Sequence, residues 1–178
     1  TQVGGVTIVG GKLDLTGNTL KYVDYSAVGN ANSQQVGAVK FKLTTNYAGT
    51  PVVWDKCFFA ISRASGDSRN LIRLRHAIGT GRLYLEINDS AGVVLISANL
   101  GVWSPLAGTT YEFEINYDLT GGTSRVFIDG TLFGLPVAAL GTRDSNIGLL
   151  RIGSNETAGV NSDFYIDDFV VFNAVQHV

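Results

Sequence analysis

Apolar and polar residues alternate along most of this chain, with the period of two that is typical of strands and not of helices. Residues 39–43 (Val-Lys-Phe-Lys-Leu) place two lysines opposite three apolar side chains, as in a strand with one buried face. Residues 111–117 repeat the pattern, with Glu112 and Glu114 expected on the solvent side. Clusters of Gly, Asn, Asp and Thr separate the apolar runs at intervals of roughly 8 to 12 residues. The pattern predicts an all-β sandwich of two packed antiparallel sheets.

A first hairpin is expected around residues 78–81 (Ile-Gly-Thr-Gly), and side-chain type alone sets its register. The expected cross-strand pairs are Ile72 with Ile87, Leu74 with Leu85, Arg73 with Glu86, and Arg75 with Tyr84. The first two pairs face the core, and the other two form an ion pair and a cation–ring pair on the outer side. A slip by one residue would turn both arginines into the core, so this register is strongly favoured.

A second hairpin is expected to close over residues 118–123, which include Gly121-Gly122. It pairs Phe113 with Ile128 and Ile115 with Val126. Asp129-Gly130 follows at once and is typical of a type I′ turn, so a third strand should complete a meander. Near the end of the chain, the apolar phase slips across Asp167-Asp168, which predicts a β-bulge in a long final strand.

Composition narrows the function classes. The 178 residues show no internal repeat or linker and predict one domain, residues 1–178. The net charge of −2 provides no excess of positive charge to attract the phosphate groups of DNA or RNA, so we expect no nucleic-acid partner. The single cysteine, Cys57, excludes an internal disulfide and lies in an apolar run typical of a buried, inert thiol. No apolar run is long enough to span a bilayer, and we expect no membrane insertion.

The chain opens at Thr1, contains no methionine and is poor in charge, which favours a processed product or a segment of a longer protein acting outside the cytosol.

Four segments, in order, resemble the laminin G-like group of the concanavalin A-like lectin/glucanase superfamily. They are residues 10–25, residues 37–55, residues 110–130 with Ile128-Asp129-Gly130, and residues 150–173. The resemblance implies a jelly roll with one convex and one concave sheet. Such domains bind glycans or protein ligands as modules of extracellular, cell-surface or virion proteins, and some relatives are glucanases or polysaccharide lyases.

Glycan recognition combines aromatic platforms with planar hydrogen-bonding side chains. The candidate ligand-binding residues are Trp54, Trp103, Arg73, Arg75, Tyr84, Glu86 and Asn88. With Arg69 and Arg82 nearby in sequence, this surface is expected to be locally basic and to favour acidic glycans. The alternative is that both tryptophans belong to the core and that the Arg–Glu–Tyr row only stabilises a solvated sheet.

A structural calcium ion is the candidate cofactor. Asp167 matches the last-strand aspartate that often binds Ca²⁺ in the superfamily, and Asp168 stands beside it. Hard cations need several oxygen ligands, which a sheet-rim carboxylate and loop carbonyls can supply. The alternative is a solvated turn whose carboxylates cap backbone N–H groups.

Catalysis is a minor hypothesis. Glu112 and Glu114 have the alternate spacing that a retaining glycosidase would use, but they lack the glucanase motif. A lyase would pair a tyrosine with a histidine, and His76 is expected to face away from Arg75 and Tyr84. We therefore expect a non-catalytic module that binds a carbohydrate or surface ligand within a larger extracellular or virion protein. The alternatives are a capsid-decoration or tail-fibre domain that adheres through protein contacts and, less favoured, a glycan hydrolase or lyase.

Overall fold

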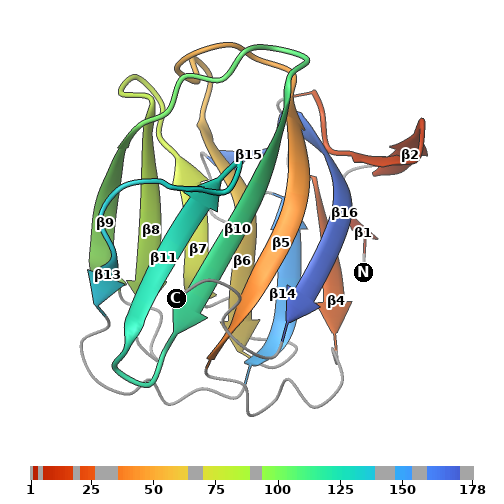
Figure 1. Ribbon diagram of the computed structural model, residues 1–178. Coiled ribbons are helices and arrows are strands. Elements are labelled where there is room, and N and C mark those ends of the chain that lie inside the picture. The colour runs from red at the N-terminus through yellow and green to blue at the C-terminus, as the bar shows by residue number, and fades with distance from the viewer. Residues whose placement is uncertain are drawn as a thin grey trace.

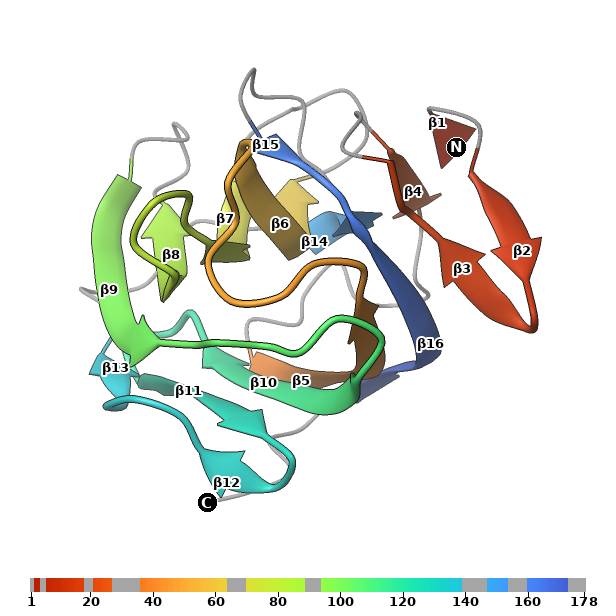
Figure 2. The same ribbon diagram turned by 90° about the horizontal axis from the view of Figure 1, so that it is seen from above.

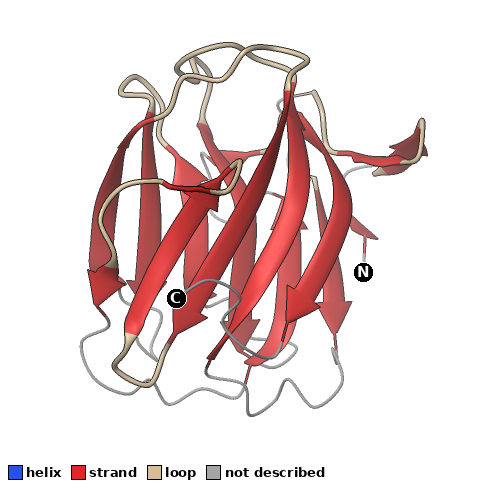
Figure 3. Ribbon diagram, viewed as in Figure 1, coloured by secondary structure: helices blue, strands red, loops and turns tan. Residues whose placement is uncertain are grey.

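The computed structural model is a sandwich of two antiparallel β-sheets (Figures 1 and 3). It describes residues 2–3, 6–17, 21–26, 36–63, 70–88, 94–138, 147–153 and 160–172. All regular elements within these ranges are strands. None of the described residues belongs to a helix long and apolar enough to cross a membrane. The all-β prediction is therefore confirmed.

The first sheet has the order β1-β4-β14-β6-β7-β8-β9, with β15 pairing in parallel to β6. Its strands are β1 (Gln2–Val3), β4 (Tyr22–Ser26), β14 (Ile147–Gly153), β6 (Asp55–Arg63), β7 (Asn70–His76), β8 (Arg82–Asn88), β9 (Val94–Val102) and β15 (Val160–Asn161). Strands β6 to β9 follow one another along the chain, whereas β14 inserts between β4 and β6. Such a return of a late strand between early ones is how a jelly roll is wound.

The second sheet has the order β12-β11-β10-β5-β16-β3-β2, with β13 pairing to β11. Its strands are β12 (Thr131–Leu132), β11 (Thr123–Ile128), β10 (Thr110–Asp118), β5 (Val36–Thr45), β16 (Phe164–Phe172), β3 (Lys12–Asp14), β2 (Thr7–Val9) and β13 (Val137–Ala138). Seen from above, the two sheets face each other across the core, and the β2–β3 hairpin extends away from the sandwich (Figure 2).

Both predicted hairpin registers are confirmed. Strands β7 and β8 pair with Ile72 opposite Ile87 and Arg73 opposite Glu86, as side-chain type required. Strands β10 and β11 pair with Phe113 opposite Ile128. The turn at Asp129-Gly130 has φ values of 51° and 75°, and β12 completes the meander. The pairing of side chains across each hairpin was therefore sufficient to predict its register.

The bulge in the last strand is also confirmed. The register between β16 and β5 shifts between Asp167 and Val170, and Asp168 has a φ of 49°. The shift turns Phe169 inward, where its ring stacks on Phe41. The bulge thus lets one strand keep its apolar side on the core across two consecutive aspartates.

The core lies between the sheets and is centred on aromatic rings. Phe58 packs against Trp103, Phe113 and Phe164, with ring centroids 5.3–5.7 Å apart. Cys57 is fully buried as a free thiol, as expected, and burial raises its pKa to about 11. A large aromatic core makes the fold independent of disulfides.

One burial prediction is wrong. Glu112 is partly exposed and pairs with Lys40 (Oε1 to Nζ, 2.7 Å), but Glu114 is buried although it lies on the outer side of β10. The side-chain nitrogen of Asn116 donates a hydrogen bond to Glu114 at 3.1 Å. A carboxylate with a hydrogen-bond donor can be buried at a tolerable cost, which alternation alone does not show.

Candidate functional site

A row of polar side chains crosses the outer side of the first sheet. The strand register aligns Asp24 with Arg151, Arg151 with Ala60, Ala60 with Arg73, Arg73 with Glu86, and Glu86 with Ser97. An adjacent row aligns Arg75 with Tyr84 and Tyr84 with Asn99. We call these outward residues, together with Asp55, the polar face: Asp24, Asp55, Arg73, Arg75, Tyr84, Glu86, Ser97, Asn99 and Arg151.

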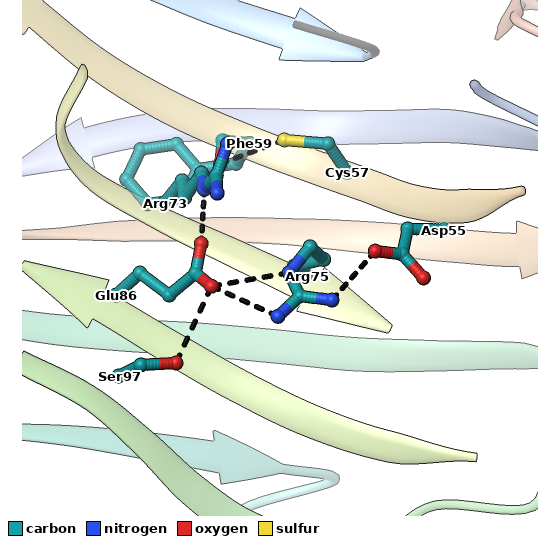
Figure 4. Close-up of polar contacts among 7 residues, drawn as sticks. All are labelled: Asp55, Cys57, Phe59, Arg73, Arg75, Glu86 and Ser97. Atoms are coloured by element: carbon teal, nitrogen blue, oxygen red, sulfur yellow. Dashed lines mark hydrogen bonds and ion pairs between the residues drawn. The ribbon is translucent and has the colours of Figure 1, made fainter. Parts of the chain in front are cut away.

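Glu86 is the centre of the polar face (Figure 4). Its Oε2 accepts a hydrogen bond from Nε of Arg73, and its Oε1 accepts from Nη2 and Nε of Arg75 at 2.9 and 3.2 Å. Ser97 Oγ lies 3.4 Å from the same Oε1. Arg75 also donates from Nη1 to Asp55 at 2.6 Å. One buried carboxylate thus holds two guanidinium groups in a defined geometry.

The electrostatics of Glu86 follow from these contacts. Burial alone would raise the pKa of its carboxyl, but the hydrogen bonds and charges of Arg73 and Arg75 outweigh burial and lower the pKa overall. Glu86 is therefore ionised at neutral pH. An ion pair this well desolvated and hydrogen-bonded is a rigid element of the surface, unlike an exposed pair.

A second ion pair lies farther along the polar face. Arg151 binds Asp24 in a bidentate manner, at 2.6 and 2.7 Å, and its guanidinium lies 3.8 Å from the ring centre of Tyr22. Arg75 stacks similarly on Tyr84, at 4.8 Å. Each arginine is therefore fixed by a carboxylate and, in two cases, by an aromatic ring.

The most exposed part of the polar face lies on β9, where Ser97 and Asn99 are exposed. Partly exposed members are Asp24, Asp55, Arg73, Arg75 and Tyr84. Asn99 is oriented by a hydrogen bond from the backbone N–H of Gly101 to its side-chain oxygen, at 3.1 Å. This part offers hydroxyl, amide, phenol and guanidinium groups beside the edge strand of the sheet.

The structure brings together four of the seven predicted ligand residues: Arg73, Arg75, Tyr84 and Glu86. Asn88 is buried, and its Oδ1 has no hydrogen-bond partner in the described part of the chain. Trp103 is only 6% exposed and packs on Phe58 and Phe113, so its ring belongs to the core and cannot stack on a ligand. Trp54 is 50% exposed in the β5–β6 loop, next to Asp55.

The expected basic character is not found in this network. Its three arginines, Arg73, Arg75 and Arg151, are matched by Asp24, Asp55 and Glu86. Arg82 is exposed at the start of β8, outside the network, and Arg69 lies outside the described residues. The sequence analysis paired Arg73 with Glu86 but missed the ion pairs of Arg75 with Glu86 and Asp55, which is why the surface was expected to be basic.

The two predicted calcium ligands, Asp167 and Asp168, lie side by side at the bulge in β16. Asp168 Oδ2 accepts a hydrogen bond from the ammonium of Lys42 at 2.5 Å, and Asp167 Oδ1 accepts the backbone N–H of Asp168 at 2.9 Å. Among the described residues, no group of three or more His, Cys, Asp or Glu side chains converges in a way that could hold a metal. Asp168 thus already has the Lys42 ammonium as a partner, and calcium binding at Asp167 and Asp168 stays a prediction.

The catalytic candidates are not poised either. Glu112 pairs with Lys40, and Glu114 is buried against Asn116. His76 faces away from Arg75 and Tyr84, as expected, but its Nδ1 lies 2.8 Å from the hydroxyl of Tyr47. This Tyr–His pair is of the type that a lyase uses, yet His76 is fully buried between the sheets, out of reach of a polymer.

Several members of the polar face escaped sequence reasoning: Asp24, Asp55, Ser97, Asn99 and Arg151. Asp24 and Arg151 meet because β4 and β14 pair, although they lie 127 residues apart. Ser97 and Asn99 alternate with apolar residues in β9. Their outward direction could therefore have been predicted from this alternation once β9 was known to pair with β8. Asp55 had no local signal beyond its place at a strand start.

Comparisons with known proteins show the fold. Galectin LEC-6 from Caenorhabditis elegans is 13% identical, with a TM-score of 0.58, and the match covers 86% of this chain and 92% of the galectin. The receptor binding domain of botulinum neurotoxin C/D mosaic serotype is 14% identical over 99% of this chain, with a TM-score of 0.70. Trypanosoma rangeli sialidase is 14% identical over 98% of this chain, with a TM-score of 0.68.

The chain spans 43% of the toxin domain and 27% of the sialidase. No protein-family model matches the sequence, and no curated protein matches it. At these identities the likeness concerns the backbone alone. The chain therefore has the lectin-like jelly-roll fold that it shares with galectin, the toxin domain and the sialidase.

Proposed function

We propose that this domain is a non-catalytic carbohydrate-binding module, of the laminin G-like kind, within a larger extracellular, cell-surface or virion protein. Its binding site is the polar face, entered from β8 and β9. The observation that carries the proposal is the bridge from Glu86 to Arg73 and Arg75 beside the ring of Tyr84. The lectin-like fold of the chain supports it, because a galectin shares that fold over most of its length.

The chemistry of the polar face suits sugar hydroxyls. A sugar ring offers an apolar face for stacking and a fan of hydroxyls that need donors and acceptors in defined places. Tyr84 supplies the aromatic surface, and Arg75, Ser97 and Asn99 supply the polar groups. Because the guanidinium groups are already held by Glu86 and Asp55, little side-chain entropy is lost on binding.

Charge balance in the network favours neutral glycans. An acidic sugar would have to approach Arg73 and Arg75 against the nearby carboxylates of Glu86 and Asp55. Charge-matched side chains gain little from an added anion, whereas hydroxyl groups can bond to both partners of an ion pair. We expect neutral oligosaccharides to bind better than sialylated or uronic ones.

The same contacts argue against catalysis at this site. A glycosidase acid needs a carboxyl whose pKa is raised so that it holds a proton at working pH. Glu86 has a lowered pKa, and both of its oxygens accept hydrogen bonds from arginine. It is built to position other groups and not to transfer a proton.

The test is a glycan array probed with the wild type and with the variants Arg75→Ala and Tyr84→Ala. We expect binding to neutral glycans to fall about five- to thirtyfold in each variant, since each removes a contact worth about 1–2 kcal/mol. The matched control is Lys42→Ala, which breaks an ion pair on the outer side of the second sheet and should leave binding unchanged.

Thermal unfolding of every variant separates loss of a contact from loss of the fold. Glycan binding that persists in folded Arg75→Ala and Tyr84→Ala would exclude the polar face as the site. A wild type that binds no glycan at all would favour the alternative, a capsid-decoration or tail-fibre domain that adheres through protein contacts.

A further inference from the structure

Three loops come together at one end of the sandwich, at the top of Figure 1. They are residues 46–54 between β5 and β6, residues 77–81 between β7 and β8, and residues 103–109 between β9 and β10. We call these three segments, with the adjoining Val102, the loop end. Its exposed large apolar residues are Val52, Val53, Trp54, Ile78, Val102 and Leu106. The polar face meets the loop end at Asp55, whose Oδ1 accepts the backbone N–H of Ile78 at 2.6 Å.

Each loop is hydrogen-bonded to both of the others through the backbone. Gly49 N–H donates to the carbonyl of Pro105 at 2.8 Å, and Gly79 N–H donates to that of Pro51 at 3.2 Å. Trp103 N–H donates to the carbonyl of Gly81 at 2.8 Å, which closes the triangle. These three hydrogen bonds fix the loops against one another and satisfy the backbone groups that form them without water.

The loop end also carries no formal charge. Residues 46–54, 77–81 and 103–109 contain no Asp, Glu, Lys or Arg, and their exposed polar side chains are Asn46, Thr80 and Ser104. Charges begin where the loops join the strands, at Asp55 and Arg82. An apolar tip above a polar ring is the distribution found in structures that sit at a lipid–water boundary.

Trp54 is held outward by its backbone. Its φ is 60°, in the left-handed region that bulky residues rarely adopt, and its side chain is 50% exposed. Val52 and Val53, directly before it, are exposed as well. A backbone that presents three consecutive large apolar residues to solvent carries strain that a binding role would explain.

We propose that the loop end docks onto the surface of an uncharged lipid bilayer, with Val52, Trp54 and Leu106 entering the boundary between headgroups and acyl chains. A bilayer fits better than a protein partner because the three loops contain no charged side chain to set an orientation and are tied together by backbone hydrogen bonds. Tryptophan is one of the two residue types enriched at that boundary. The inference is independent of glycan binding, since it uses no residue of the polar face.

The experiment is co-sedimentation with phosphatidylcholine vesicles, combined with tryptophan fluorescence. We expect binding that is equal at low and high salt, because apolar contact and not charge drives it. Trp54 emission should shift to the blue and become protected from acrylamide. Trp54→Phe, which leaves only the buried Trp103, should abolish the shift.

Matched substitutions locate the contact. Val52→Asp and Leu106→Asp change side chains that are 86% and 65% exposed, so the fold should survive, and the bound fraction should fall at least about tenfold. Ile8→Asp changes a side chain that is 66% exposed on the distant β2 and should bind like the wild type. Absence of binding to vesicles, or equal loss in Ile8→Asp, would overturn the proposal. Self-association of the wild type without lipid, abolished by Val52→Asp, would overturn it in favour of a second copy as the occupant.

Discussion

At the scale of single residues, His76 shows how burial converts an ordinary side chain into a pH-dependent one. Its imidazole is fully buried, with Tyr47 at Nδ1, the ring of Trp103 at 5.1 Å, and the charges of Asp55 and Lys56 nearby. Burial outweighs the favourable contacts and lowers the pKa of His76 from 6.5 to about 4. The folded protein therefore holds this histidine neutral at physiological pH.

The lowered pKa of His76 makes the stability of the fold depend on pH. Because the pKa in the folded state lies below that in the unfolded chain, protonation favours unfolding, and the stabilisation is complete above pH 6.5. It is lost as the pH falls towards 4, by an amount on the order of 3 kcal/mol. Denaturant unfolding of His76→Gln across this range should show a flatter pH dependence than the wild type.

His177→Gln is the matched control, since it removes the other histidine of the chain and should keep the steep dependence. If His76→Gln lost stability with falling pH as steeply as the wild type, another group would have to be responsible. The paired carboxylate Glu86, whose pKa is lowered, contributes only as the pH falls below its ordinary value of 4.5.

At the scale of elements, the packing of β5 between β10 and β16 requires a residue without a side chain at Gly37. A Cβ at this position would lie 2.6 Å from the hydroxyl of Tyr117 on β10 and 2.7 Å from the carbonyl oxygen of Phe172 on β16. Neither strand can retreat without disturbing the pairing on both sides of β5. Gly37→Ala should therefore lower the free energy of unfolding by about 1–3 kcal/mol, measured in urea.

A double-mutant cycle with Tyr117→Phe examines this cause. Removing the hydroxyl should return part of the stability lost in Gly37→Ala, because one of the two close contacts disappears. Strictly additive effects of the two substitutions would show that Tyr117 is not the obstacle.

Elements were also the scale at which the sequence was most informative. The pairs Arg73–Glu86 and Phe113–Ile128 lie within single hairpins, so side-chain type and turn residues were enough to align them. The pair Asp24–Arg151 was beyond reach, because it depends on which distant strands become neighbours. Glu114 was misplaced for a related reason: alternation gives the side of a sheet, but not whether that side meets water.

At the scale of the whole molecule, calcium was expected from resemblance and not from the local charges. Asp168 forms an exposed ion pair with Lys42, which a calcium ion would have to displace. We expect the melting temperature to be the same with a calcium chelator and with excess Ca²⁺. A rise of several degrees with Ca²⁺ would instead place a site that includes residues outside the described ranges.

The loop end is a second feature that depends on the whole fold and that the sequence alone did not reveal. The sequence search for membrane contact looked for one long apolar run, and the expectation of no insertion rested on its absence. The apolar residues at this end come from three segments separated along the chain, each too short to attract notice. Only the fold, which ties Gly49 to Pro105 and Gly79 to Pro51, assembles them into one surface.

The bridge formed by Glu86 has an evolutionary consequence. Because one carboxylate offsets two guanidinium groups, a single replacement of Glu86 by glutamine would leave Arg73 and Arg75 with only Asp55 between them. The centre of the surface would then turn cationic without any change in the backbone. Under the proposed function, descendants of one ancestral domain could thus diverge from uncharged towards anionic sugars in one step, so ligand preference within such a lineage should be read from position 86 before overall similarity.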